Sequence, residues 1–362
     1  MAGLYVHIPF CQRRCLYCDF FSTTRLERRE AYIQAVLTEI AERKNEASEP
    51  IRTIYLGGGT PSTLEAADIA RILEAVGTNE AEEITMELNP GDATPETMRA
   101  LRKANINRLS IGIQSFQDDL LALIGRRHNA QQAIEAVRMA QEAGFDNISI
   151  DLMYALPTQT MRQWQADLQT ALSLHVQHIS TYGLMYEQGT PLTRQRDEGL
   201  LTPIDEDTEN AMYDFLCDLL AHEGWTHYEV SNFALPGYEA KHNSAYWDGT
   251  PYIGIGAGAH SYIGRVRSWN PEDLDAYIHG ILAHNLLRES ETLTERDIYN
   301  EYIMLGLRTA KGIRTTRLQA EYNETILDFT RDNLLTFTGD ERIVATRKGL
   351  HILNRIIEDL MI

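Results

Sequence analysis

Residues 4–20 read LYVHIPFCQRRCLYCDF, a stretch that places three cysteines in a CxxxCxxC spacing directly after a short apolar run. Three thiolates held this close can bind three irons of a cubane [4Fe–4S] cluster and leave the fourth iron open. The amino and carboxylate groups of S-adenosylmethionine (SAM) could chelate that iron. An electron passed to the sulfonium would then break a C–S bond and release a 5′-deoxyadenosyl radical. We therefore expect Cys11, Cys15 and Cys18 to hold such a cluster.

Two other uses of these thiols stay open. A structural zinc site needs four ligands, usually supplied as two close pairs, and the one remaining cysteine is Cys217. His7 or Asp19 would have to complete a zinc set. Unligated or redox-active thiols are the second alternative. A disulfide framework is disfavoured in a long chain with four cysteines and no secretory signal.

The composition predicts a globular chain with more than one domain. The chain has 362 residues, 43% of them hydrophobic, and a formal net charge of −19. This charge disfavours nucleic acid and anionic membrane surfaces as partners. No apolar run approaches the roughly 20 residues of a transmembrane segment, and the start of the chain lacks the pattern of a signal peptide. We expect a cytoplasmic protein.

Strand-like and helix-like segments alternate through the first half of the chain. Six strands joined by helical crossovers predict a parallel sheet, and several of the strands read as near-continuous apolar runs, as in strands covered on both faces. A full barrel needs eight units, so the expected fold class is α/β, with an open, partial (β/α)6 barrel over residues 1–190. The strands are expected at 4–8, 53–56, 84–88, 108–113, 148–152 and 178–184, and helices at 29–43, 66–76, from Pro95, and at 118–124, 130–143 and 161–174.

Unusual residues follow several of these strands, at the sheet edge where ligands collect. Residues 57–61 read GGGTP, and glycine lets backbone carbonyls approach the ammonium of bound SAM. The alternative is a tight turn into a helix. Glu87 and Asp151 are single carboxylates at strand ends, suited to accept hydrogen bonds from a ribose or an amino group. Their alternative role is a helix cap or a turn anchor.

Five further side chains are candidates for the same edge. Gln114 and Arg126 could contact ribose and carboxylate groups, and the alternative for Arg126 is a surface charge. Tyr17 lies between two of the cysteines and could pack on adenine or simply within the loop. Tyr5 and His7 lie on the first strand, and one of them is expected to reach the cluster.

The alternation changes after about residue 190. Residues 191–270 are expected to form a connecting segment, with an amphipathic helix that carries Cys217 as a small apolar core residue. The motif KHNSAYW follows at 241–247, in what reads as a loop. His242 in this motif could be an axial ligand of haem iron, and the aromatic residues beside it suit a flat macrocycle. The alternative is a hydrogen-bonded histidine that closes the barrel mouth.

The last part of the chain, 271–362, is predicted to be a mostly helical, winged-helix-like domain. Helices are expected at 298–309, 316–322, 323–333 and 350–360, with a short hairpin wing near 342–349.

Five motifs in order over residues 4–192 resemble the radical SAM family of oxygen-independent coproporphyrinogen III oxidases. The KHNSAYW segment resembles the signature of one branch, the HemW-type haem chaperones, and extends the resemblance over nearly the whole chain. It implies a protein that holds a [4Fe–4S] cluster and SAM, binds haem and transfers it to an unidentified acceptor protein. The five motifs are the cysteine loop with HIPFC before it, GGGTPS, ELNP, GIQSF and IDLMYALPTQT.

The resemblance also implies roles for single residues. The three cysteines match the cluster ligands, and His242 falls in the segment implicated in haem binding. Tyr5, Gly58, Gly59, Thr60 and Glu87 match positions around cluster-bound SAM, and Tyr17, Gln114, Arg126 and Asp151 match positions that contact SAM or a second SAM.

Two departures separate this chain from the oxidases. The oxidases have another cysteine two residues after the third ligand, where this chain has Phe20, and they have a long N-terminal extension, whereas this chain starts ten residues before Cys11. Both departures disfavour the alternative function, radical decarboxylation of coproporphyrinogen III to protoporphyrinogen IX, and a second SAM site. A radical methylase or tRNA-modifying enzyme is disfavoured by the acidic charge and by the motif contexts.

Overall fold

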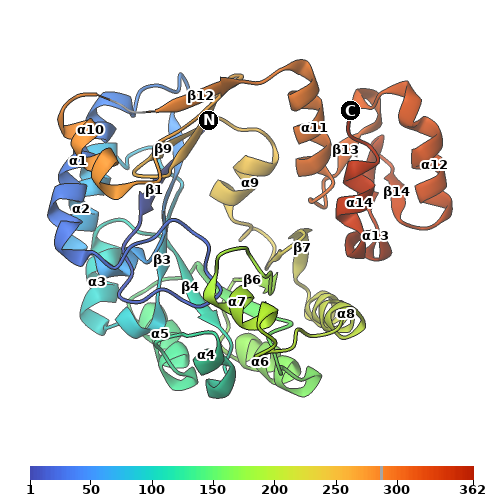
Figure 1. The fold of residues 1–362 in the computed structure, drawn as a ribbon, viewed down its shortest axis with the longest axis horizontal. Helices are drawn as coiled ribbons and strands as arrows, with labels where there is room; N and C mark the ends of the chain where they lie inside the picture. The colour runs from blue at the N-terminus through green and yellow to red at the C-terminus, as the bar shows by residue number, and fades with distance from the viewer. Residues whose placement is uncertain (286–287) are drawn as a thin grey trace.

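The centre of the molecule is a curved sheet in which six parallel strands follow one another in chain order (Figure 1). The computed structural model describes residues 1–285 and 288–362. Each parallel strand pairs with the next one in the sequence, as the predicted partial barrel requires. The strands are β1 (Ala2–Ile8), β2 (Ile51–Gly58), β3 (Glu83–Leu88), β4 (Arg108–Gln114), β5 (Ile148–Tyr154) and β6 (His178–Gly183).

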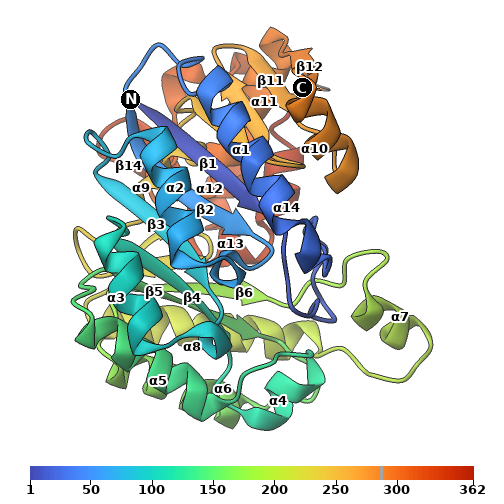
Figure 2. The same ribbon diagram turned by 90° about the vertical axis from the view of Figure 1, so that its left-hand side faces the viewer.

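Helices between these strands cover the convex side of the sheet (Figure 2). Their starts follow local capping rules: Thr94 accepts a hydrogen bond from the Thr97 N–H ahead of Pro95, and Asn129 and Thr160 form capping boxes. The helices are α1 (Arg29–Arg43), α2 (Ala66–Val76), α3 (Pro95–Lys103), α4 (Asp118–Leu123), α5 (Ala130–Glu142) and α6 (Met161–Ser173).

The parallel strands alternate between apolar and polar side chains. In β1, Leu4, Val6 and Ile8 pack into the core under the helices, while Tyr5 and His7 share the other, concave face. The strands are buried on both faces, as expected, but the inner face carries polar side chains and is not part of a continuous apolar run. The concave face lines the barrel interior, where its buried polar side chains pair with one another and, at one end, with His242 of the helix at Lys241–Trp247.

The segment after β6 adds strands to both edges of the same sheet. At one edge, β8 pairs antiparallel with β6, and β7 pairs antiparallel with β8. At the other edge, β9 lies parallel to β1 and is followed by β10, β11 and β12. The glycines around β9 hid this seventh parallel strand from sequence reasoning. The elements of this part are α7 (Pro191–Asp197), α8 (Glu206–His222), β7 (Thr226–Glu229), β8 (Asn232–Ala234), α9 (Lys241–Trp247), β9 (Tyr252–Ile255), β10 (His260–Ile263), β11 (Val266–Trp269), α10 (Leu274–Leu282) and β12 (Glu289–Thr292).

A buried ionic network fastens the added edge to α1. The Glu39 carboxylate, which is fully buried, pairs with Arg43 at 2.5 Å and accepts hydrogen bonds from Asn270 at 2.7 Å and Tyr277 at 2.7 Å. It also accepts the backbone N–H of Gly256 at 2.8 Å. One carboxylate therefore connects α1 to α10 and to the residues that directly follow β9 and β11.

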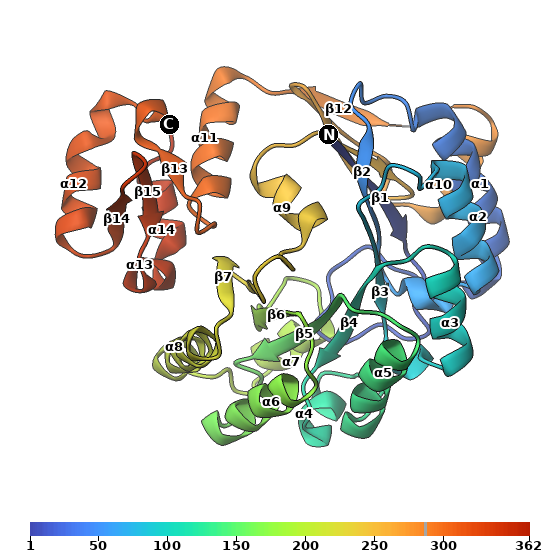
Figure 3. The ribbon, with the colours of Figure 1, turned by 180° about the vertical axis from the view of Figure 1, so that it is seen from behind.

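The C-terminal part has its own hydrophobic core and a three-stranded sheet in the order β13-β15-β14 (Figure 3). The antiparallel β14–β15 hairpin contains only the start of the wing predicted at 342–349, because β14 precedes that range and residues from Arg347 on form a helix. The helix expected at 316–322 is two short 3₁₀ turns, and the expected closing helix is divided into α13 and α14. The elements are α11 (Glu295–Gly306), β13 (Ile313–Arg314), α12 (Asn323–Arg331), β14 (Leu335–Thr338), β15 (Arg342–Ala345), α13 (Arg347–His351) and α14 (Leu353–Glu358).

Across residues 1–285 and 288–362, no helix combines the length and the apolar character that a membrane crossing demands.

Replacing Glu39 by Ala should strongly destabilise the protein. The change removes the fully buried partner of Arg43, which keeps only the partly exposed Glu46, and it leaves Asn270 and Tyr277 without this acceptor. Breaking a buried pair of this kind costs about 3–5 kcal/mol. Urea unfolding measures this difference. The control is Glu96→Ala, because the Glu96–Arg99 pair is largely exposed and should contribute less than about 1 kcal/mol. Equal effects of the two substitutions would contradict a structural role for the buried network.

Candidate functional site

The cysteine loop leaves the C-terminal end of β1, as predicted. Cys11 is buried, and Cys15 and Cys18 are half-buried. The Cys11 N–H donates to the Thr23 carbonyl at 2.9 Å, which closes the loop at its base. Burial raises the pKa of the Cys18 thiol to about 11 and that of Cys11 in the same direction. These thiols would have to lose protons to bind a metal, as is usual for thiolate ligands.

The loop differs from a preformed zinc site. In the part of the chain that the structure describes, no three His, Cys, Asp or Glu side chains converge closely enough to hold one metal ion. A zinc site brings four ligands onto a single ion, whereas cysteines of an iron–sulfur cluster each bind a different iron. Cys217 lies in the core on α8, as expected, and takes no part in the loop.

The glycine triplet brings the end of β2 against the cysteine loop. The Gly59 N–H donates to the Ile8 carbonyl at 2.9 Å. A Cβ on Gly59 would lie 2.8 Å from the Pro9 backbone and 3.1 Å from Cys11 Sγ. Gly58 has φ +114°, and a Cβ there would meet the His7 ring at 2.5 Å. The triplet is therefore required for a close approach of two loops, more than for a simple turn.

Thr60 and Arg126 bring polar groups close to two of the cysteine sulfur atoms. Thr60 Oγ1 lies 3.4 Å from Cys11 Sγ, and Arg126 Nη1 donates to Cys15 Sγ at 3.4 Å. Arg126 therefore lies against the cysteine loop and is not a free surface charge. Its Nε is buried and has no hydrogen-bond partner among the residues the structure describes. An unpaired buried donor of this kind suits an anionic group of a ligand, such as a carboxylate.

Glu87 lies at the same edge of the sheet. Its carboxylate accepts the Tyr55 hydroxyl at 2.9 Å and the Gly58 N–H at 3.1 Å. Burial, together with the charge of Asp151, raises the pKa of Glu87 to about 7. The carboxylate is thus fixed beside the glycine triplet, where the polar groups of SAM are expected.

Asp151 and Gln114 occupy the neighbouring strands. Asp151 accepts the Ser110 hydroxyl at 3.2 Å, and burial raises its pKa. Gln114 has φ +72°, and its amide lies beside Gly112, as does the Arg126 guanidinium. The structure therefore gathers Glu87, Gln114, Arg126 and Asp151 around the cysteine loop, although the sequence placed them on three different strands and a loop.

The three candidates with aromatic rings, Tyr5, His7 and Tyr17, lie in two different places. Tyr5 and His7 both point to the concave face, because residues two apart in a strand share a side, and the Tyr5 hydroxyl donates to His7 Nδ1 at 3.0 Å. His7 Nε2 donates in turn to the Phe21 carbonyl at 2.9 Å. Tyr17 packs against a small apolar cluster that includes Leu120.

His242 lies at the other end of the barrel. Its Nδ1 is 2.9 Å from the Thr53 hydroxyl, near the start of β2, whereas the glycine triplet is at the end of that strand. Its Nε2 is 2.9 Å from the Tyr246 hydroxyl. The imidazole is 2% exposed, and burial and the nearby Arg108 cation lower its pKa to about 3. It is therefore a neutral imidazole with both nitrogens in hydrogen bonds.

The segment around His242 is a helix, α9, and not the expected loop. The Glu83 carboxylate of β3 accepts the N–H groups of Lys241 and His242, both at 2.9 Å. A distant strand thus caps the first turn of α9. No local signal in the motif predicts this contact.

Tyr55 connects the two ends of the barrel, and sequence reasoning missed it. The His242 ring stacks on the Tyr55 ring with centroids 5.2 Å apart, and the Tyr55 hydroxyl donates to Glu87, which accepts the Gly58 N–H. The period-2 pattern of β2 puts Tyr55 on the same face as Thr53 and was the available signal.

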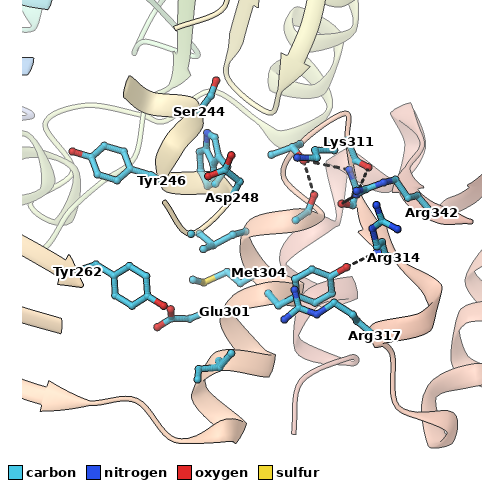
Figure 4. Close-up of a pocket in the computed structure, with 18 of the residues that line it drawn as sticks. Ser244, Tyr246, Asp248, Tyr262, Glu301, Met304, Lys311, Arg314, Arg317 and Arg342 are labelled. Atoms are coloured by element: carbon cyan, nitrogen blue, oxygen red, sulfur yellow. Dashed lines mark hydrogen bonds between the residues drawn. The ribbon is translucent and has the colours of Figure 1, made fainter. Parts of the chain in front are cut away.

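A cavity of about 680 Å³ opens on the outer side of α9 (Figure 4). Ser244, Tyr246 and Trp247 of the motif line one side, and residues of the C-terminal part line the other. Sites for small molecules typically have volumes of about 300–1,000 Å³. The sequence motif therefore faces a space large enough for a cofactor-sized ligand.

Comparisons with known proteins agree with this architecture. The family described as the Radical SAM superfamily matches residues 5–171, and the HemN C-terminal domain family matches residues 293–352. The solved structure of Escherichia coli coproporphyrinogen III oxidase (HemN) superposes with a TM-score of 0.84 over 99% of this chain and 90% of that one, at 24% identity. The predicted fold class is confirmed.

Curated relatives narrow the assignment. The protein named heme chaperone HemW from Lactococcus lactis is 37% identical over 99% of this chain and 97% of its own length, and the Bacillus subtilis protein of that name is 35% identical over 90% and 88%. A Danio rerio protein named radical S-adenosyl methionine domain-containing protein 1, mitochondrial, is 35% identical over 86% and 74%.

These matches define a radical SAM protein, a class that implies a [4Fe–4S] cluster and SAM. Within that superfamily, the chain belongs to the HemW family. The family expected from the motifs is thereby confirmed.

Replacing Cys11 by Ala should abolish the iron–sulfur cluster, because only two of the three thiolates would remain. Iron and inorganic sulfide are measured after anaerobic reconstitution. Cys217→Ala is the matched control, since this buried cysteine lies outside the loop, and it should retain the full iron content. Retention of the cluster by Cys11→Ala, or zinc in place of iron in the native loop, would contradict the assignment.

Replacing Glu87 by Gln should change stability in a pH-dependent way. The folded-state pKa of about 7 lies above the ordinary 4.5, so ionisation of this group destabilises the wild-type fold increasingly as the pH rises from 4.5 to 7. The variant lacks this titration. Without SAM, it should be more stable than the wild type by about 1–2 kcal/mol at pH 8, after a discount for partial exposure, and equal at pH 4.5.

Thermal unfolding at both pH values measures the difference. Glu96→Gln is the control. Because the Glu96 side chain is exposed, this variant should differ from the wild type in stability by the same amount at pH 4.5 and at pH 8. A pH-independent effect of Glu87→Gln would mean that this carboxyl titrates normally.

Proposed function

We propose that this protein is a haem chaperone, which binds a [4Fe–4S] cluster, SAM and haem and transfers haem to an acceptor protein. Its relatives named heme chaperone match nearly the whole chain. The observation that carries the proposal is the placement of the KHNSAYW helix, whose Ser244, Tyr246 and Trp247 line a cavity of cofactor size.

Cluster and SAM belong to the opposite end of the barrel in this proposal. Cys11, Cys15 and Cys18 would ligate the irons. Glu87 and the backbone at residues 58–60 would hold polar groups of SAM, and Arg126 would offer its unpaired Nε to a carboxylate. Bound there, the cluster would supply one-electron chemistry at the sulfonium. This chain's residues would orient SAM and keep its charged groups in a partly buried pocket.

Within this proposal, His242 is the candidate haem ligand. A neutral imidazole is the form that binds iron, and the low pKa keeps it neutral. Its Nε2 is engaged by the Tyr246 hydroxyl at 2.9 Å. Ligation would therefore require the Tyr246 side chain to move aside. The expected division into a barrel at 1–190, a segment at 191–270 and a domain at 271–362 is amended: β7–β12 extend the barrel sheet and α10 shares its core, so the separate C-terminal core begins with α11. A cytoplasmic location belongs to the same proposal.

Replacing His242 by Ala should weaken haem binding about tenfold or more, because the imidazole ligand is lost. A spectroscopic titration of the reconstituted protein with haem measures this. His128→Ala is the control, since that histidine is also buried, with Nε2 hydrogen-bonded to the Ile113 carbonyl at 2.9 Å, and it does not line the cavity.

Similar weak binding by the wild type and both variants would overturn the proposal. So would formation of protoporphyrinogen IX from coproporphyrinogen III in an anaerobic assay with SAM and a reductant, which would establish the oxidase activity instead.

A further inference from the structure

The cavity beside α9 has two chemically different walls. Figure 4 shows Tyr246 and Tyr262 on one side and Lys311, Arg314 and Arg342 on the other. Aromatic side chains from α9, β9 and β10 build the first wall. Five cationic side chains but only two carboxylates line the cavity, although the whole chain has a net charge of −19. The excess of positive charge is therefore local.

Two of the five cations already form ion pairs with carboxylates of the protein. Arg267 is paired with Glu301 and Glu291. Arg342 is paired with Asp340 at 3.3 Å and donates to the Gly312 carbonyl at 3.1 Å. These two side chains stabilise the cavity walls and leave little charge to offer to a ligand.

The other three cations have no such partner. Among the residues that the structure describes, no carboxylate lies within ion-pair distance of Lys311, Arg314 or Arg317. The Arg317 guanidinium stacks on the Tyr302 ring, 3.8 Å from its centroid. The Tyr302 hydroxyl accepts the backbone N–H of Arg314. Tyr302 thus places both arginines on the rim of the cavity.

A glycine fixes the turn that presents this basic group. Gly312 has φ +63°, and a Cβ there would lie 2.1 Å from the Ile343 carbonyl oxygen. The close contact with β15 fixes the chain at this turn. Lys311 directly precedes Gly312 and Arg314 follows in β13, and both side chains line the cavity. The position of the three cations is therefore built into the fold.

We propose that Lys311, Arg314 and Arg317 bind the two propionates of haem, while the porphyrin packs on the aromatic wall of the same cavity. This inference rests on the proposed haem-chaperone function and adds the residues that would recognise the ligand. A flat, apolar ring with two carboxylates at one edge matches both walls. Paired guanidinium groups are suited to carboxylates, and aromatic faces are suited to a macrocycle.

The test uses three probes on the full-length, reconstituted protein: haem, haem dimethyl ester, in which both propionates are uncharged, and metal-free protoporphyrin IX, which keeps them. Wild type should bind haem about tenfold more tightly than the ester, since exposed ion pairs contribute modestly each. The wild type should still bind protoporphyrin IX. Added salt should weaken the binding of haem more than the binding of the ester, because salt screens the ion pairs with the propionates.

The triple variant Lys311→Gln, Arg314→Gln, Arg317→Gln should lose this preference and bind haem and its ester equally. Arg296→Gln, Arg331→Gln, Lys348→Gln is the matched control, because it removes three exposed cations of the same domain outside the cavity. Iron content and unfolding temperature show whether each variant is folded.

The outcomes separate the two proposals. If wild type binds haem but shows no preference over the ester, the propionate site is wrong and the haem-chaperone function stands. An unchanged preference in the triple variant would overturn the propionate site in the same way. If wild type binds none of the probes, both proposals are overturned.

Discussion

The alternation of side chains along β1 to β6 is the constraint on which the rest of this structure depends. Apolar residues of each strand lie under the outer helices, so the concave face receives the polar ones. A buried polar group without a partner is costly, and the interior is accordingly filled with hydrogen bonds, such as Ser149 to His178 at 2.7 Å. Arg126 Nε, which is buried and has no partner among the described residues, is a group that a ligand bound beside the cysteine loop would satisfy.

The same polar face connects the two ends of the barrel. At the carboxyl end, the Gly57–Gly59 backbone lies against the cysteine loop because no side chain separates them. At the amino end, His242 is held between Thr53 and Tyr246. The Tyr55 ring stacks on the His242 ring at the amino end, and the Tyr55 hydroxyl donates to Glu87 at the carboxyl end. A SAM site and a haem site built on these residues would share one continuous set of contacts.

The sequence predicted the parts that depend on local patterns. The bounds of α1 and α2 are as expected, because apolar periodicity and helix starts are local signals. The CxxxCxxC loop and the carboxylates at strand ends were recognisable for the same reason. The strands are covered on both faces, as expected, but the inner face is polar because its side chains satisfy one another across neighbouring strands, as Ser110 and Asp151 do. The loop predicted around His242 is a helix because Glu83, far away in sequence, accepts its first N–H groups.

Taken alone, the sequence determined the family, the parallel half-barrel and the residues that gather at its carboxyl end, because motif spacing and strand–helix alternation are written into neighbouring positions. Only the tertiary structure decided that β9 joins β1, that the KHNSAYW helix lies at the end opposite the cysteines, and that three cations of the C-terminal domain face its aromatic residues. The physical reason is that these are contacts between segments far apart in the chain, such as Thr53 and His242, which are separated by 189 positions. Their partners are chosen by burial and hydrogen bonding across the folded chain.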